Sequence, residues 1–194
     1  MPLSPTDARS AAKDIQYQIA NLNPATLITL FEIDVSQLYT DEGLTDNDWQ
    51  VFRFHNNVKV LNTSIFYGYN DRKGDIEYAA VPIFADGWEI NAKGTPPQPK
   101  LSISVNPDGI NFLGVFKNRI RQLGDLVGSK VTRIRTFSTY LNARNFLPGE
   151  IPEGFIPLTA GGFVRELPRD IFYIDRKSGE NKSGIEFQLA SVLD

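Results

Sequence analysis

The sequence contains no cysteine and only one histidine among its 194 residues. The first absence excludes disulfides, thiolate nucleophiles, zinc fingers and cysteine-ligated iron–sulfur clusters. The second leaves His55 as the one imidazole, so a single chain cannot supply a site with two or three histidine ligands. A Ser-His-Asp triad would have to be built around His55. These absences remove most catalytic chemistries and favour a protein of binding or assembly.

Long apolar runs are also missing, and no stretch approaches the 18 residues that a membrane-spanning helix needs. The first seven residues lack the basic region and apolar run of a secretory signal. No glycine-rich phosphate loop, dinucleotide fingerprint or nucleophile elbow occurs. The net charge of −3 gives the whole molecule no electrostatic attraction to nucleic acid or acidic membranes.

What is present is the composition of a globular protein, with 41% hydrophobic and 22% charged residues. The length suggests one domain, or one domain with a small appendage. We therefore divide the chain into an N-terminal helical arm, residues 1–24, and a β-rich domain, residues 25–194.

The arm is predicted to be an amphipathic helix that begins at Thr6 or Asp7 and stops at Asn23-Pro24. Its apolar residues recur every three or four positions, which places them on one face. Such a helix packs either on its own domain or on another subunit, and for the second case Ile15 and Ile19 are the candidate interface residues. The predicted stripe is Ala8, Ala12, Ile15, Ile19 and Leu22.

The remaining domain is dominated by short strand patterns separated by turn residues. Residues 27–35 predict a strand with Phe31, Ile33 and Val35 on one face, and residues 100–105 show the clearest alternation of apolar residues with serine. Pro82 is expected at an edge or bulge. Further candidates are residues 49–54, 58–60, 64–69, 76–84, 87–91 and 130–137.

A second helix is predicted over residues 115–127, with Gly128 as its C-terminal cap. Its expected apolar stripe is Phe116, Ile120, Leu123 and Val127. After a Pro- and Gly-rich loop over residues 147–162, the chain is expected to close with a hairpin over residues 171–192. This hairpin would turn at Ser178-Gly179 and bury Ile185, Phe187 and Leu189.

Strands thus outnumber helices and do not alternate with them, which argues against a parallel doubly wound sheet. We expect a mainly β (α+β) fold: an antiparallel β-sandwich or barrel with an N-terminal helix and one flanking helix.

Candidate chemistry is sparse. His55 could act as a general base, but it ends a strand pattern and no nucleophile is placed beside it. A carboxylate pair for glycoside hydrolysis has no recognisable spacing. The acidic loop over residues 41–48 does not match a calcium-binding loop. We therefore expect no catalytic residue, no metal and no cofactor.

The charge distribution carries more information. Residues 1–80 hold six basic and eleven acidic side chains, whereas residues 117–144 hold seven basic side chains against Asp125 alone. Three readings remain open: a solvated surface, a nucleic-acid contact, or an acidic region of one subunit facing the basic region of the next. For the third reading the candidate residues are Asp41, Glu42, Asp46, Asp48, Arg119, Arg121 and Arg133.

Several runs resemble the minor tail protein L family of lambda-like phages. They are residues 30–34, 87–94 with the step into 101–105, 126–137, 141–146, 172–177 and 187–191. The resemblance implies a non-enzymatic structural protein of the virion tail tip, with a β-rich fold related to tail-tube modules. It also implies assembly in the host cytoplasm and no membrane insertion.

The implied partners are copies of the chain in a trimeric ring, the distal tail protein and the central hub or tip fibre protein. Genomic DNA would pass through the ring without sequence-specific binding. Longer family members continue into a cysteine-bearing domain with an iron–sulfur cluster, whereas this sequence ends at Asp194, so that cofactor is not expected. The alternatives are a hydrolase and a glycan-binding β-sandwich module, the latter favoured if Trp49, Tyr67, Tyr69 and Trp88 are exposed.

Overall fold

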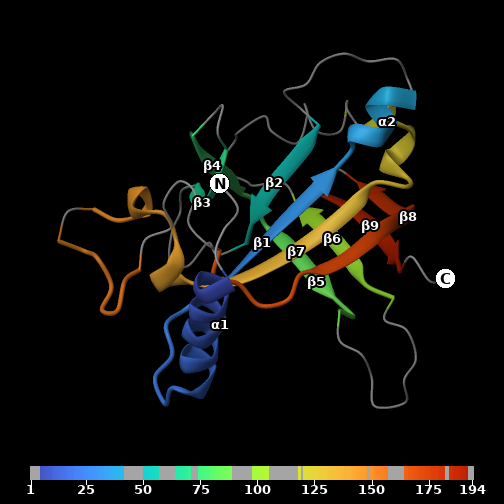
Figure 1. Ribbon diagram of the computed structural model, residues 1–194. Coiled ribbons are helices and arrows are strands. Elements are labelled where there is room, and N and C mark those ends of the chain that lie inside the picture. The colour runs from blue at the N-terminus through green and yellow to red at the C-terminus, as the bar shows by residue number, and fades with distance from the viewer. Residues whose placement is uncertain are drawn as a thin grey trace.

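The strands in the part of the chain that the structure describes pair into one sheet (Figure 1). The structure is a computed structural model that describes residues 5–41, 50–56, 64–70, 74–88, 98–104, 118, 120–147, 149–156, 164–181 and 184–191. The described part contains nine strands in the order β3-β4-β2-β1-β7-β8-β9-β6-β5. They are β1 (Leu27–Asp34), β2 (Val51–His55), β3 (Ile65–Asn70), β4 (Gly74–Ala80), β5 (Ile83–Asp86), β6 (Lys100–Ser104), β7 (Lys130–Phe137), β8 (Asp170–Asn181) and β9 (Gly184–Ala190). The predicted mainly β class is confirmed.

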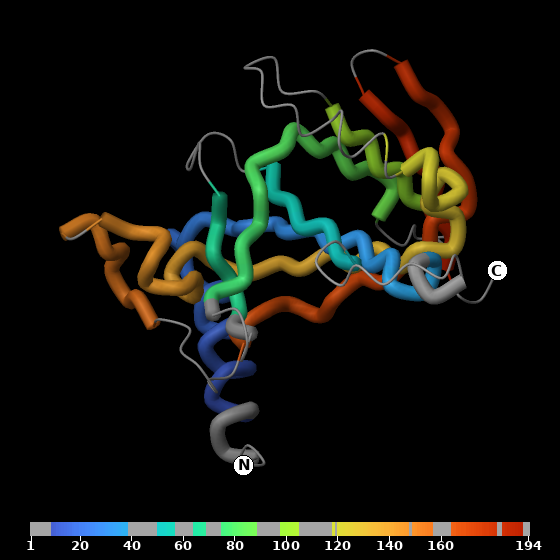
Figure 2. Tube along the Cα trace, turned by 90° about the horizontal axis from the view of Figure 1, so that it is seen from above, coloured from blue at the N-terminus to red at the C-terminus, as the bar shows by residue number. Residues whose placement is uncertain are grey.

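The sheet closes on itself through the junction of β4 and β5. These strands lie near opposite ends of the strand order but are joined in sequence by Val81-Pro82 alone. The Val81 N–H donates to the His55 carbonyl at 3.0 Å, and the Ser104 N–H donates to the Pro82 carbonyl at 2.9 Å. Figure 2 shows this continuous segment crossing from one side of the sheet to the other. The result is a barrel, in which Pro82 interrupts a strand where only its carbonyl is needed.

The pairing is antiparallel between neighbours except for β2 and β4, which run parallel with Phe54 opposite Ala79. This single parallel pair departs from the expected all-antiparallel sheet. It arises because β4 must run on into β5, on the far side of the closure, instead of turning back along β2.

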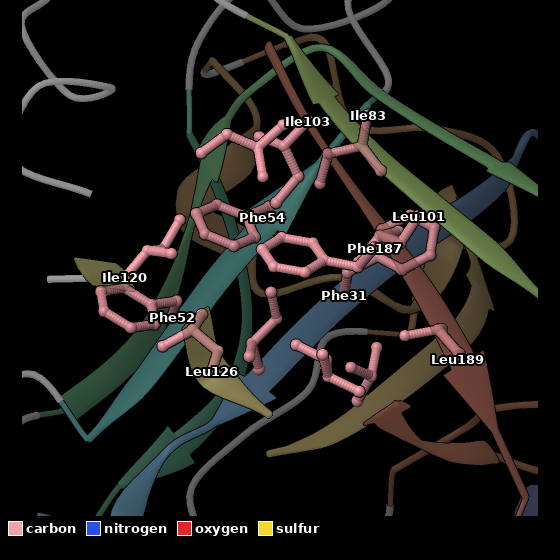
Figure 3. Packing of buried hydrophobic residues seen from close by; sticks show 14 of the residues in the cluster. Phe31, Phe52, Phe54, Ile83, Leu101, Ile103, Ile120, Leu126, Phe187 and Leu189 are labelled. Atoms are coloured by element: carbon pink, nitrogen blue, oxygen red, sulfur yellow. The ribbon is translucent and has the colours of Figure 1, made fainter. Parts of the chain in front are cut away.

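The barrel interior is filled by apolar side chains from strands all around its wall (Figure 3). Phe31, Ile33 and Val35 share the inward face of β1, as the alternation predicts. The hairpin residues of β9 also point inward and are at most 3% exposed. The inward set includes Phe31, Ile33, Val35, Phe52, Phe54, Leu101, Ile103, Ile185, Phe187 and Leu189.

A second apolar cluster covers the outer face of β1 and β7. Ile28 and Leu30 on β1 and Ile134 on β7 pack against Tyr67 and Tyr78 from the β3–β4 hairpin. The middle of β1, at Leu30 and Phe31, is therefore buried on both faces, and the sheet is not a simple layer with one solvated side.

The helical elements are short apart from the first. They are α1 (Pro5–Ala20), α2 (Ser36–Asp41) and the 3₁₀ turns η2 (Gly124–Leu126), η3 (Ser138–Tyr140) and η4 (Ala143–Asn145). No sequence pattern predicted α2.

The buried face of α1 includes Ile15 of the predicted stripe but not Ala12 or Ile19, which are exposed. Ala11, Ile15 and Gln18 are at most 7% exposed, whereas Ile19 is 61% exposed. The physical reason is Gln18, whose Oε1 accepts the Ala25 N–H at 3.0 Å and so ties the helix end to the chain that leaves it. A polar side chain thus takes the central position that apolar periodicity assigned to Ile19.

The helix predicted over residues 115–127 is wrong at its C-terminal end. Within the described part, helical residues are 118 and 120–122, and the chain then makes a left-handed turn with φ near +57° to +60° at Gly124, Asp125 and Leu126. Leu126 is fully buried and Val127 is 46% exposed, the reverse of the predicted stripe. Ile120 and Leu123 are buried as predicted.

The closing hairpin forms, but its turn lies later than predicted. β8 continues to Asn181, and Ser178 falls at a register shift between Lys177 and Gly179. A Ser-Gly pair therefore marks a β-bulge here, which uses the same small residues as a turn. Of the other predicted strands, residues 58–60 lie outside the described part, and Gly87-Trp88 is not a strand.

Candidate assembly surface

The one histidine of the chain lies in the interior. His55 is fully buried in β2, so it has no access to a substrate in solution. Among the described residues no group of three or more His, Cys, Asp or Glu is arranged to hold a metal ion. The same residues contain no helix with the length and apolar character to cross a membrane.

An open cleft of about 400 Å³ lies beside the β8–β9 hairpin, against β6. Its carboxylates are already partnered: Glu180 pairs with Arg121 at 3.0 Å and with Lys177 at 2.9 Å, and Glu186 accepts from Ser178 at 2.8 Å. The Lys177 and Ser178 contacts join residues of the hairpin, and the Arg121 contact ties it to the segment before β7.

Helix α1 is fixed to the barrel by an aromatic contact and two polar ones. Ile15 packs with Phe137 and Tyr140, whose rings meet edge to face at 6.3 Å between centroids. The Tyr140 hydroxyl donates to the Asp14 carbonyl at 2.9 Å, and the Arg165 Nε donates to the Asp14 carboxylate at 2.6 Å. One turn of the helix is therefore anchored to β7 and its following segment.

This anchoring separates the two predicted interface residues of the helix. Ile15 is buried against its own chain and has no surface left for a partner, because the Phe137–Tyr140 pair covers it. Ile19 stays exposed, as do Tyr17 at 67% and Leu22. Ile15 is therefore no longer a candidate for a subunit contact. Ile19 stays a candidate, and the exposed Tyr17 becomes one.

After β7 the chain leaves the barrel in a long loop over residues 138–156, which we call the excursion. The Ile156 N–H donates to the Thr139 carbonyl at 2.9 Å and closes its two ends. Figure 1 shows it in orange, projecting away from the barrel. Binding residues are often found on loops that a rigid scaffold positions at the surface.

Two asparagines fix the base of the excursion to the edge strand β3. The Asn145 side chain accepts the Phe66 N–H and donates to the Phe66 carbonyl, both at 2.7 Å. Asn142 does the same for Gly68, with both distances 3.1 Å. Each amide thus binds both backbone groups of one residue, as a neighbouring strand would. We call this pair the asparagine clamp.

The clamp has two further supports. Asn142 also donates to the Asp75 carboxylate at 2.7 Å, and the Arg144 guanidinium lies 4.2 Å from the centre of the Phe66 ring. Gly68 has φ +92°, a conformation that favours glycine. The clamp occupies hydrogen-bonding groups that an edge strand otherwise offers to other chains, so it protects β3 from unplanned pairing.

The outer end of the excursion exposes apolar and acidic side chains together. Phe146 and Phe155 meet edge to face at 5.1 Å and hold the loop in shape. Leu147 is 65% and Ile151 57% exposed. The charged residues between 147 and 156 are Glu150 and Glu153, and both are exposed. We call this part the tip.

Among the basic residues proposed to face a neighbour, two already have partners within the chain. Arg133 binds Asp170 at 2.8 Å and lies 4.7 Å from the centre of the Trp88 ring. Arg121 pairs with Glu180 but is 65% exposed. Asp41 ends α2, and Glu42, Asp46, Asp48 and Arg119 lie outside the described residues. The charge-array hypothesis therefore stays a prediction.

The aromatic residues considered for glycan binding are largely core residues. Tyr67 is 2% and Trp88 5% exposed, and Trp49 and the Tyr69 side chain lie outside the described part. Burial raises the pKa of Tyr67, and it also raises the pKa of Tyr78, whose hydroxyl donates to Glu32 at 2.8 Å. Both phenols stay protonated and serve the fold, so a sugar-stacking platform built on Tyr67 and Trp88 is not present.

The described part of the chain is thus a closed barrel with an anchored helix and a clamped excursion. Residues 45–194 match the family described as phage minor tail protein L, and the chain belongs to this family. It is a minor tail structural protein of a phage virion. It is similar to tail tip protein L of Escherichia phage lambda, with 33% identity over 73 residues. That match covers 38% of this chain and 29% of the relative.

The family match has an informative limit. It begins at residue 45 and so does not include α1 or β1. It does include the clamp, and residues 141–146, one of the runs that resemble the family, contain both asparagines. Sequence reasoning gave that run no structural role, because its partners on β3 lie more than 70 positions away.

Proposed function

We propose that the chain is a non-enzymatic subunit of the tail tip that assembles into a ring between the distal tail tube and the central hub or fibre protein. The ring would leave a channel for DNA, which passes without sequence-specific binding. Assembly would take place in the host cytoplasm before the tail is complete. The proposal needs no cofactor, since the chain has no cysteine to bind a cluster.

The observation that carries this proposal is the placing of exposed apolar side chains on two projecting elements. Tyr17 and Ile19 on α1 and Leu147 and Ile151 on the tip are each more than half exposed. Scattered exposed apolar residues are common, but these four project from the barrel on two anchored elements. The Ile15 contact fixes α1, and the clamp fixes the base of the excursion. Surfaces of this kind are typical of protein–protein contact sites.

Membership of a family of minor tail proteins supports the same conclusion from an independent direction. The lambda relative is a tail tip protein, and this supports the tip as the location. Neither observation depends on the exposure of particular side chains.

Electron microscopy of purified virions tests the proposal. Density for the barrel should occur in several symmetry-related copies around the tail axis, next to the tube. A virion that lacks the protein should show tails without a tip, and a plasmid copy of the gene should restore them. Intact, infectious tails in its absence would contradict the proposal.

A further inference from the structure

We propose that copies of this chain join head to tail, with the tip of one copy seated on the solvent face of α1 of the next. This inference rests on the proposed function and names the contact that would build the ring. The tip residues are Leu147, Glu150, Ile151 and Glu153, and the helix residues are Arg9, Lys13 and Tyr17.

The helix side of this contact is a basic and apolar face. Arg9, Lys13 and Tyr17 are spaced by four residues, so they lie above one another on the side of α1 opposite the buried Ala11 and Ile15. Arg9 and Lys13 are exposed and form no ion pair with another described residue. The acidic residues of α1 are Asp7 and Asp14, and Asp14 is already held by Arg165.

The tip is complementary in both charge and apolar character. Its charged residues are two exposed glutamates, which form no ion pair with another described residue, and Leu147 and Ile151 stand next to them. Apolar contact would supply affinity, while the opposite charges would fix the register and speed association.

The tip and the solvent face of α1 in one copy do not bind each other. α1 and the excursion start from a common anchor at Tyr140 but project in different directions in both views (Figures 1 and 2). A surface and its complement at different places on one molecule make a heterologous contact. Repetition of such a contact gives a ring where the rotation closes and a filament where it does not.

Charge reversal tests the pairing. The tip variant Glu150→Lys/Glu153→Lys and the helix variant Arg9→Glu/Lys13→Glu should each bind themselves about tenfold or more weakly than the native chain, measured as mass by light scattering. A mixture of the two, and a chain with all four changes, should recover association, because opposite charges then face each other again. The matched control is Glu77→Lys/Arg176→Glu, which reverses two exposed charges elsewhere and should leave association unchanged.

Cross-linking provides a second readout that does not depend on affinity. The chain has no cysteine, so Tyr17→Cys and Ile151→Cys each introduce the sole thiol. Oxidation of the two variants together should give a covalent dimer that contains one of each, and either variant alone should stay uncross-linked. Dimers of a single variant with itself would instead show a two-fold contact and overturn the head-to-tail arrangement.

The outcomes separate this inference from the proposed function. Charge variants that assemble like the native chain, or a native chain that stays monomeric at about 1 mM, overturn the named contact. If such variants still restore tail tips to a virion lacking the protein, the proposed function stands without this interface. If the native chain is absent from tail tips, the proposed function fails whatever its self-association.

Discussion

Removal of the Asn142 side chain is expected to destabilise the whole domain. Asn142 is 2% exposed and makes three hydrogen bonds, two to Gly68 and one to the Asp75 carboxylate. Each neutral bond contributes about 1 kcal/mol and the charged one about 1.5–3 kcal/mol. Asn142→Ala should therefore lower the free energy of unfolding by about 3.5–5 kcal/mol, or the melting midpoint by about 7–20 °C for a chain of this size.

A double-mutant cycle distinguishes the clamp from a simple loss of packing. Asn142→Asp keeps the shape but sets a second carboxylate against Asp75, so it should be at least as destabilising as alanine at neutral pH. Adding Asp75→Asn restores a donor opposite the new carboxylate, and the double variant should regain about 1–2 kcal/mol over Asn142→Asp.

Urea unfolding followed by far-UV circular dichroism measures both effects, with hydrogen exchange of the Gly68 amide as a local readout. The matched control is Asn21→Ala, because Asn21 accepts a single exposed bond from the Asn23 N–H and should cost less than about 0.5 kcal/mol. A cost for Asn142→Ala as small as that of the control, or no recovery in the double variant, would refute the reasoning.

Three further changes probe other parts of the fold by the same unfolding measurement. Gly184→Ala would place a Cβ 2.7 Å from the Ile103 carbonyl oxygen, so the backbone must shift and stability should fall by about 1–3 kcal/mol; an unchanged midpoint would contradict this close approach. Phe187→Ala empties a fully buried site in the barrel and should cost about 3–5 kcal/mol; a loss below 1 kcal/mol would mean that the core collapses around it. Burial raises the pKa of Asp34, but hydrogen bonds from Ser36 and the charge of Lys130 outweigh this effect, so the pKa lies below the usual 3.8. The ionised Asp34 therefore stabilises the fold, and this stability is lost as the pH falls below 3.8. Asp34→Asn should therefore flatten the pH dependence of stability below pH 3.8, and an unaltered profile would exclude this role.

The strands and their faces could be predicted because their signals are local. Residues 130–137 were predicted as a strand and form β7 with the same bounds, and Phe31, Ile33 and Val35 were assigned to one face. Alternation of apolar residues reports which side of a strand is buried, whatever the strand pairs with. The order of the strands and the closure through Val81-Pro82 have no such local signal.

The candidate site was less predictable because its residues act across long separations or against periodicity. The α1 stripe was assigned by apolar spacing, yet the bond from Ala25 to Gln18 rotates the helix onto a different face. The turn at Gly124–Leu126 places two non-glycine residues in the left-handed region, which costs roughly 1–2 kcal/mol for each. Burial of Leu126 and the contact of Lys177 with Asp125 at 2.6 Å hold it there, and neither is visible in the local sequence.

The pairing of β1 with β7 sets the order of events when the chain is made. Leu27 lies opposite Phe137, so the second strand of the pair is synthesised 110 residues after the first. Because synthesis proceeds at about 5–20 residues per second, β7 emerges from the ribosome several seconds or more after β1. During that time its apolar residues have no barrel interior to enter, which favours early cover by a chaperone.

Barrel closure then adds a second delay. β6 pairs with β9, and Leu101 lies opposite Phe187. The barrel therefore closes only after nearly all described residues have been synthesised. Folds that depend on such distant contacts fold slowly. A subunit with this topology should therefore join its neighbours as a finished barrel, and the rate at which tails are completed would follow the folding of single chains.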